Sequence, residues 1–424
     1  MPLVFRKILS AWMTSAFSRA IMGLLSLTVF TGLLNFGSNI IAARVLGPIQ
    51  YADYVTFAAL LSLLLIPNAT MTTKAAQATG LPRSHPSGLH GLRHIAVLGG
   101  NVQALVGASV MFMIYQHEYA ILPTHWWIPV FTGGMLWFAP LEAFYVGVLQ
   151  GQKKFIASQL GRSLNAICKV IGIAGLWIWG GNLNDALAIA LASQACTLLY
   201  VLGIVRNSPR IQELFSRLGV HVSLRRLLRP ADWASAFVVT LSSIIFFNLD
   251  MIIARSVLSP HAAGLFAALG TSGKVLALTT GPISYVLYPH LLTTADPIRR
   301  RRLILTSWVG TGGIGLSIVV CLAVMAHPLV HLLFGAAYEA VAPVLVFYGL
   351  AFAFFSLANI AFTVLLSVNA KILWIDVLGG GLLELIALLS FHKNVMMFTI
   401  ALATCMGLLW VVSSVHALRE VARR

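Results

Sequence analysis

Long apolar runs separated by short polar segments dominate this chain of 424 residues. Each run is about 20 residues or longer, which is the length that an α-helix needs to cross the hydrocarbon core of a bilayer. Polar residues do not alternate with apolar ones inside the runs, so the pattern predicts helices rather than barrel strands. We place twelve spans, at residues 20–43, 52–75, 94–115, 126–149, 158–180, 184–204, 232–254, 263–289, 304–326, 341–368, 372–391 and 395–417.

The composition supports a membrane environment. Hydrophobic residues make up 59% of the chain and charged residues only 9%, whereas a soluble domain carries about a quarter charged residues. So few charges cannot cover a surface that faces water, so lipid must cover most of it. The predicted fold class is therefore an all-α polytopic membrane protein with about 12 transmembrane helices.

The basic residues indicate the orientation of the chain. Of the 28 lysines and arginines, 23 fall on the same side of the predicted spans as the N-terminus. The opposite side holds three, Arg44, Arg255 and Lys393, and the spans contain Lys169 and Lys274. Basic loops stay in the cytoplasm, and an even number of spans returns the chain to its starting side, so both termini are predicted to be cytoplasmic. Orientation explains the net charge of +16, and no nucleic-acid partner is expected.

The two halves of the chain resemble each other. Ile40-Ile-Ala-Ala-Arg-Val-Leu-Gly-Pro48 in the first half matches Ile252-Ile-Ala-Arg-Ser-Val-Leu-Ser-Pro260 in the second. We predict an N-terminal lobe of six spans at 1–205, a basic cytoplasmic linker at 206–230, and a C-terminal lobe of six spans at 231–424. Duplicated halves of this kind are typical of transporters, with the substrate site between them.

Motifs for nucleotide or metal chemistry are not convincing. Gly310-Thr-Gly-Gly-Ile-Gly315 fits a dinucleotide-binding pattern, but it lies inside a predicted span with no strand before it. Gly273-Lys274 lacks the first glycine and the Ser or Thr of a phosphate-binding loop. The histidines and cysteines form no metal-ligand pattern, and the loops are too short for a catalytic domain. We therefore expect no cofactor, no metal, no catalytic residue and no enzymatic activity.

Charges inside the spans are the most informative residues, because burying a charge in hydrocarbon is costly. Lys274 and Lys169 lie too deep to reach the interface easily, which favours a position beside a water-filled cavity. Asp250, Glu142 and Glu384 are candidates for ion coupling or for pairing with a cation. The sequence leaves open whether each acid titrates during transport or pairs with a neighbouring helix.

Four segments carry a resemblance to a known family. They are Ala43-Arg-Val-Leu-Gly-Pro-Ile-Gln-Tyr51, Leu149-Gln-Gly-Gln-Lys-Lys-Phe155, Asn248-Leu-Asp-Met-Ile-Ile-Ala-Arg255, and Leu333-Phe-Gly-Ala-Ala-Tyr-Glu-Ala-Val-Ala-Pro-Val-Leu345. Together they resemble the O-antigen-type polysaccharide flippases of the multidrug/oligosaccharidyl-lipid/polysaccharide exporter superfamily.

This resemblance implies two six-helix lobes around a central cavity. It also implies a substrate, an oligosaccharide on polyprenyl pyrophosphate that moves from the inner to the outer leaflet of the cytoplasmic (inner) membrane. Membrane lipids and other membrane proteins of polysaccharide assembly are the further partners. A pyrophosphate needs counter-charges in the cavity, and Lys274, Lys169, Arg44 and Arg255 are the candidates. Alternating access is the expected mechanism.

Three other functions compete with this one. A multidrug/cation antiporter of the same fold needs an acidic cavity, which Glu142, Asp250 and Glu384 could provide. A membrane-embedded glycan polymerase or glycosyltransferase needs a large external loop or a soluble catalytic segment, and the pattern contains neither. A non-transporting membrane scaffold does not explain the duplicated halves or the intramembrane charges.

Overall fold

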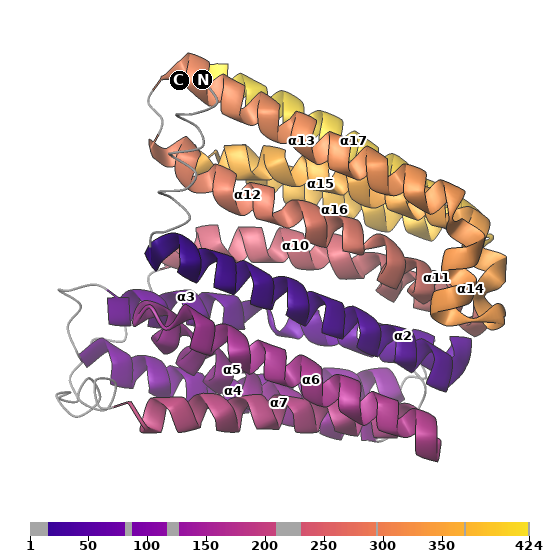
Figure 1. Ribbon diagram of the computed structural model, residues 1–424, viewed down its shortest axis with the longest axis horizontal. Coiled ribbons are helices and arrows are strands. Elements are labelled where there is room, and N and C mark those ends of the chain that lie inside the picture. The colour runs from indigo at the N-terminus through magenta and orange to yellow at the C-terminus, as the bar shows by residue number, and fades with distance from the viewer. Residues whose placement is uncertain are drawn as a thin grey trace. The chain divides into compact units, whose positions relative to one another are not determined.

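The computed structural model describes residues 16–80, 87–116, 127–208, 230–293, 296–368 and 370–422. All of the regular elements in these residues are helices (Figure 1). They are α2 (Ala16–Leu64), α3 (Ile66–Gly80), α4 (Ser87–Gln116), α5 (Trp127–Gly151), α6 (Phe155–Trp179), α7 (Leu183–Arg206), α10 (Pro230–Val257), α11 (Pro260–Gly273), α12 (Val275–Thr293), α13 (Pro297–Val324), α14 (Ala326–Phe334), the 3-10 helix η1 (Ala336–Val344), α15 (Leu345–Ser367), α16 (Ile372–Ser390) and α17 (Val395–Ala422).

Each of the twelve predicted spans coincides with helix in the structure. Within the described residues, nine segments are long and apolar enough to cross a membrane. Most of the first predicted span and the beginning of the second fall in one of these segments, Ser26–Leu64, while α6 and α10 are not among the nine. In α6, Arg162 and Lys169 lower the mean hydropathy. The chain is therefore an all-α, multi-pass membrane protein.

Several predicted spans are not single straight helices. Helix α2 contains the first predicted span and the beginning of the second, and it is interrupted between them at Gly47, whose φ of 67° lies in the left-handed region that glycine adopts without strain. A break at Leu65 separates α2 from α3, and another at Lys274 separates α11 from α12. Span ten begins five residues earlier than predicted, as the 3-10 helix η1. A break in a helix leaves backbone N–H and C=O groups without their helical partners. Inside a membrane, such breaks therefore occur where protein or water can satisfy those groups.

The chain divides into two compact units by its internal contacts. In the described residues the first unit contains 16–41, 67–112, 127–208 and 230–233, and the second contains 42–66, 113–116 and 234–422. The second unit thus includes residues 42–66, from the first half of the sequence. The two six-helix lobes remain a prediction. Most of the predicted linker, residues 209–229, lies outside the described residues, as do Arg6, Lys7, Arg83, Arg423 and Arg424.

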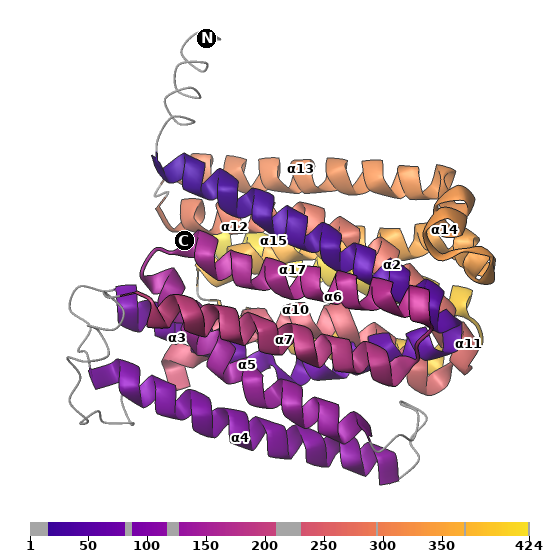
Figure 2. The same ribbon diagram turned by 60° about the horizontal axis from the view of Figure 1, so that its bottom comes forward.

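In the first unit, α5, α6 and α7 run side by side (Figure 2). A buried apolar cluster joins α3, α4, α5 and α7 around Phe144 and Leu92. A small polar contact joins α2 to α6, where the Thr31 and Ser163 hydroxyls lie 2.7 Å apart. Gln159 Nε2 donates to Thr31 Oγ1 at 3.4 Å. These hydroxyl and amide groups satisfy one another inside the bundle, as buried polar groups in membranes generally do.

In the second unit, α15 is the central helix and packs against α12, α13 and α17 (Figure 1). Its aromatic side chains form a continuous stack with α10 and α11. Tyr348 stacks on Phe352 with ring centroids 5.1 Å apart, and Phe266 meets Tyr348 edge-on at 5.4 Å. Edge-to-face and offset pairs stabilise such a core beyond simple area burial.

The end of the first matching motif packs against Gly264, four residues after the second motif. A Cβ atom added at Gly264 would lie 2.0 Å from the Pro48 carbonyl oxygen. A glycine at position 264 therefore allows α11 to approach the turn after Gly47 closely.

We expect Gly264→Ala to destabilise the protein because the methyl group would overlap backbone atoms that cannot rotate away. Overpacking of this kind lowers the free energy of unfolding by about 1–3 kcal/mol. Thermal unfolding of the purified protein measures the effect. Gly379→Ala is the matched control, since an added Cβ there meets nothing within 4 Å. Equal melting temperatures for the two variants would contradict the prediction.

Candidate functional site: a buried charge cluster in the second unit

Asp250 of α10 is the centre of a buried polar cluster. Its side chain is fully buried, with 0% exposure. Its Oδ1 accepts a hydrogen bond from the Met251 amide at 2.8 Å and lies 3.3 Å from Lys274 Nζ. Its Oδ2 accepts a hydrogen bond from the Tyr348 hydroxyl at 2.6 Å. Both oxygens of this buried carboxylate therefore have polar partners, as buried charged groups require.

Lys274, the second charged member of the cluster, lies at the break between α11 and α12. Its ammonium donates to the Phe247 carbonyl as well as contacting Asp250. It also lies 5.7 Å from the centre of the Phe352 ring, within the range of a cation–π contact. Gly273 makes room beside it, since a Cβ there would lie 2.2 Å from the Tyr348 ring. The predicted intramembrane cation is therefore paired within its own unit.

Glu384 of α16 is the third charged member of the cluster. It is fully buried, and neither carboxylate oxygen has a hydrogen-bond partner among the described residues. It interacts electrostatically with Asp250 and Lys274, and Tyr348 and Cys405 are also within range. Buried carboxylates usually have hydrogen-bond partners. The site thus contains two carboxylates, from Asp250 and Glu384, and one ammonium group, from Lys274.

The predicted residue Arg255 has a different partner. Its Nε lies 2.8 Å from Asp53 Oδ1, and the two side chains are only 10% and 6% exposed. Asp53 is a carboxylate in the second predicted span, and our sequence reasoning missed it. Its presence in an apolar segment was the available signal, the same signal that selected Glu142 and Glu384.

Arg44 binds the end of α14. Its Nε donates to the Leu333 carbonyl at 2.8 Å, and its Nη2 donates to the Leu332 carbonyl. The last carbonyls of a helix lack partners within the helix and carry partial negative charge, so a guanidinium stabilises them well. In this structure Arg44 therefore caps a helix of its own unit.

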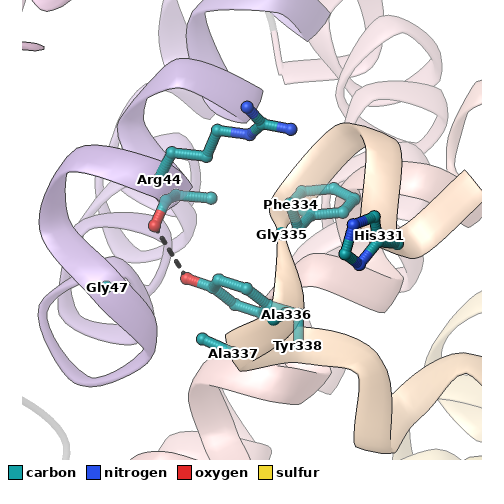
Figure 3. A pocket seen from close by; sticks show the side chains of 9 residues that line it. Arg44, Gly47, His331, Phe334, Gly335, Ala336, Ala337 and Tyr338 are labelled. Atoms are coloured by element: carbon teal, nitrogen blue, oxygen red, sulfur yellow. Dashed lines mark hydrogen bonds between the residues drawn. The ribbon is translucent and has the colours of Figure 1, made fainter.

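A shallow pocket of about 350 Å³ opens beside this cap (Figure 3). The Tyr338 hydroxyl closes one side by donating to the Ala43 carbonyl at 2.9 Å. His331 lines the pocket and pairs with Glu339. The lining residues are Ala43, Arg44, Gly47, His331, Phe334, Gly335, Ala336, Ala337 and Tyr338.

The first unit contains the other two predicted residues. Lys169 lies in the middle of α6 and is partly buried. It makes no hydrogen bond or ion pair with the residues that the structure describes. Glu142 of α5 is also partly buried, and it interacts with Arg162 and Gln194. Lys169 is thus a membrane-embedded cation without a described counter-charge.

The structure therefore brings three of the seven predicted residues together, namely Lys274, Asp250 and Glu384. Tyr348 completes that cluster, and our sequence reasoning missed it because one tyrosine in an apolar helix carries no distinctive signal. A metal site needs several acidic, His or Cys ligands close together, and the described residues contain no such group of three or more. The glycines of the dinucleotide-like pattern lie within α13.

Comparison with solved structures shows which fold this is. The chain is similar to an inward-facing multidrug resistance MATE family transporter of the MOP superfamily, with a TM-score of 0.68, 12% identity, and coverage of 95% of this chain and 98% of that chain. It is equally similar to the lipid II flippase MurJ in an inward closed conformation, with a TM-score of 0.68, 14% identity, and coverage of 94% and 89%. The bent form of the Vibrio cholerae MATE transporter VcmN matches with a TM-score of 0.60, 14% identity, and coverage of 96% and 98%.

The protein therefore has the polytopic helical fold of the multidrug/oligosaccharidyl-lipid/polysaccharide exporter superfamily, as the sequence motifs predict. These neighbours are transporters and a flippase. The sequence matches no protein-family model and no curated protein. Proteins of two transport classes thus share this fold.

Proposed function

We propose that this protein is a flippase that moves a polyprenyl-pyrophosphate-linked oligosaccharide from the inner to the outer leaflet of the cytoplasmic membrane. It would act by alternating access and serve the synthesis of a surface polysaccharide. Two observations support a transport function. The chain shares its fold with a lipid II flippase, and its spans contain buried charges. The bias of basic residues supports cytoplasmic termini.

The choice of an anionic substrate rests on the position of Lys169. A pyrophosphate cannot enter hydrocarbon without cations, because an unpaired charge there is strongly unfavourable. Lys169 offers an ammonium in the middle of a span, with no described partner in its unit to neutralise it. An anionic head group would supply the missing counter-charge. Arg44 and Arg255, by contrast, bind groups of this chain in the structure, so a direct role for them needs those contacts to open.

A multidrug/cation antiporter is the second candidate, and the fold supports it equally. Glu384 favours it, since a buried carboxylate without a hydrogen-bond partner in the described chain could attract a cationic drug or an exchanging ion. Glu142 is a further acid inside a span, in the first unit, where it interacts with Arg162 and Gln194. The two candidates predict opposite charge for the substrate, so they can be separated by experiment.

The deciding measurement is mass spectrometry of polyprenyl-linked glycans in cells that lack this protein, together with analysis of their surface polysaccharide. A flippase predicts lipid-linked oligosaccharide trapped on the cytoplasmic face and loss of the surface glycan, both reversed by re-expression. Normal glycans together with new sensitivity to cationic drugs would show the antiporter instead.

Lys169→Ala should reduce transport of the lipid-linked oligosaccharide without preventing membrane insertion. A hydrogen bond to a charged group contributes about 1.5–3 kcal/mol, so the loss should be roughly tenfold to hundredfold. Lys169→Arg should retain part of the activity because it keeps the charge. Surface glycan in a complementation assay measures the effect, with Lys393→Ala, an exposed lysine, as the control. Full complementation by Lys169→Ala would remove this residue from the substrate site.

A further inference from the structure

We propose that the start of helix α13 binds an anionic phospholipid of the leaflet at that end of the helix, the predicted cytoplasmic leaflet. The head group would lie against Arg299 and Arg302, and one acyl chain would lie along the exposed apolar face that follows them. This inference goes beyond the proposed function, because it concerns a lipid that is bound rather than transported. It follows from the charge, exposure and spacing of residues within one helix of the second unit.

Four consecutive arginines, Arg299 to Arg302, lie in the first turns of α13, directly before the predicted span that begins at residue 304. One of them turns inward, since Arg300 is partly buried and donates to the Ser367 hydroxyl of α15 at 3.4 Å. The other three are exposed and make no ion pair or side-chain hydrogen bond with the described residues. Three positive charges therefore point outward without a counter-charge from the described chain.

This end of α13 is unfavourable for so many cations. Like charges that are neighbours on a helix repel each other, and the N-terminus of a helix already carries partial positive charge. Asp296 caps the helix by accepting the Ile298 amide at 3.0 Å, and the first turn contains no acidic residue. The bias of basic residues toward the cytoplasm explains why arginines lie on this side, but not why they are gathered on one helix. An anion from outside the chain would offset both effects.

An exposed apolar face continues directly from the arginines. Arg299 and Arg302 are three positions apart, so they are neighbours on one face of α13. Leu305, Val309 and Leu316 follow Arg302 at helical spacing and lie on that same face. All three are exposed, Val309 by 74% and Leu316 by 65%. In a membrane this face contacts lipid chains, and the arginines lie at its end, where lipid head groups are found.

The glycine-rich segment of α13 is divided between two faces. An added Cβ at Gly315 would lie 3.4 Å from the Ala353 Cβ of α15, so this glycine faces the protein. At Gly310 and Gly313 an added Cβ would meet nothing within 4 Å, so these glycines face outward. The segment that fits a dinucleotide-binding pattern therefore packs against α15 on one side. On the other side it leaves open space beside the exposed apolar side chains.

An anionic phospholipid matches both parts of this surface. Guanidinium groups bind phosphate oxygens through charge-assisted hydrogen bonds. The helix advances about 16 Å between Leu305 and Leu316 at about 1.5 Å per residue, which is roughly half of the hydrocarbon core. A chain whose head group lies at the arginines can therefore contact this stretch without leaving its own leaflet. A zwitterionic lipid carries its own cation, so it offers the arginines no net negative charge.

The first test counts the lipids that the full purified chain retains in native mass spectrometry after incubation with equimolar phosphatidylglycerol and phosphatidylcholine. The wild type should bind phosphatidylglycerol saturably and in preference. Arg299→Gln/Arg302→Gln should bind it about thirtyfold more weakly, because each basic residue near an anionic lipid contributes roughly fivefold in affinity. Arg93→Gln/Arg419→Gln is the matched control, with the same change in net charge at exposed arginines of α4 and α17. Equal retention of the two lipids by the wild type, or an equal loss in the control, would overturn the proposal.

The second test locates the acyl chain and leaves the arginines in place. Val309→p-benzoylphenylalanine, irradiated in nanodiscs of equimolar phosphatidylglycerol and phosphatidylcholine, should crosslink mainly to phosphatidylglycerol. Leu378→p-benzoylphenylalanine is the control, because Leu378 of α16 is exposed at a similar distance from the start of its predicted span, and it should react with both lipids equally. The same lipid ratio at the two positions would overturn the proposal.

A competing lipid identifies the occupant. An equimolar amount of polyprenyl phosphate should not displace phosphatidylglycerol from the Val309 crosslink. Displacement would overturn the proposal in favour of the carrier lipid of the proposed cargo. All of these measurements follow a bound lipid and not transport, so a negative result here leaves the proposed function intact, and a failure of the proposed function leaves this site intact.

Discussion

Replacing Arg255 with alanine should lower the free energy of unfolding by about 3–5 kcal/mol, because it leaves the carboxylate of Asp53 buried without its cation. The two side chains are 10% and 6% exposed, and their charged atoms are 2.8 Å apart. Water can therefore not replace the lost partner. Asp53→Ala should have a similar effect, since it leaves a buried guanidinium. The free energy can be measured by reversible unfolding in mixed micelles.

The double variant Arg255→Leu/Asp53→Leu separates pairing from packing. When both charges are removed, no buried charge is left unpaired, so the stability should return close to that of the wild type. The exposed pair His331–Glu339 is the control, with side chains that are 64% and 48% exposed. Its removal should change the stability by about 1 kcal/mol or less. Additive effects of the two leucine substitutions at positions 255 and 53 would contradict direct pairing.

Asp250→Ala should abolish transport and destabilise the protein by about 3–5 kcal/mol, as expected when one partner of a buried ion pair is removed. The substitution leaves the Tyr348 hydroxyl without its acceptor and Lys274 with only the Phe247 carbonyl and the Phe352 ring. It also removes the counter-charge of the Lys274 ammonium. Complementation of the surface glycan and thermal unfolding measure the two effects.

Two variants test which property of Asp250 matters. Tyr348→Phe removes one donor from a buried carboxylate and should cost about 1–3 kcal/mol, less than the loss of the charge. Asp296→Ala is the control for aspartate removal, because Asp296 is an exposed N-cap of α13 that accepts from the Ile298 amide. Its loss should cost about 1 kcal/mol and leave transport intact. Wild-type transport by Asp250→Ala would exclude this cluster from the transport cycle.

Helices and their places along the chain could be predicted from the sequence because lipid imposes a simple rule. A segment that crosses the bilayer must satisfy its own backbone and present apolar side chains, so the twelve spans are visible as runs. The breaks were harder to predict. Lys274 interrupts a span without a proline at the break, whereas Leu65 lies two residues before Pro67. A proline cannot donate the backbone hydrogen bond that would continue the preceding helix.

The candidate site could be predicted residue by residue but not as a site. Lys274, Asp250 and Glu384 were each recognisable, because a charge in an apolar run is conspicuous. Their proximity was not, since they come from α10, the α11–α12 break and α16. The partner of Arg255 was equally hidden, because Asp53 lies 202 positions away in the chain. Side-chain pairing depends on helix rotation and depth, which hydropathy does not encode.

By itself, the sequence determined that this protein is a polytopic helical membrane protein, and its motifs pointed to the exporter fold that the structural neighbours share. These conclusions follow from the solvent, since lipid constrains length, charge and hydropathy along a single chain. Only the tertiary structure decided which charges neutralise one another. It paired Lys274 with Asp250 and Arg255 with Asp53, and it left Lys169 and Glu384 without an ion-pair or hydrogen-bond partner among the described residues. Electrostatic energy in a low-dielectric interior depends on distances of a few ångströms between helices, and only the packing of those helices sets such distances.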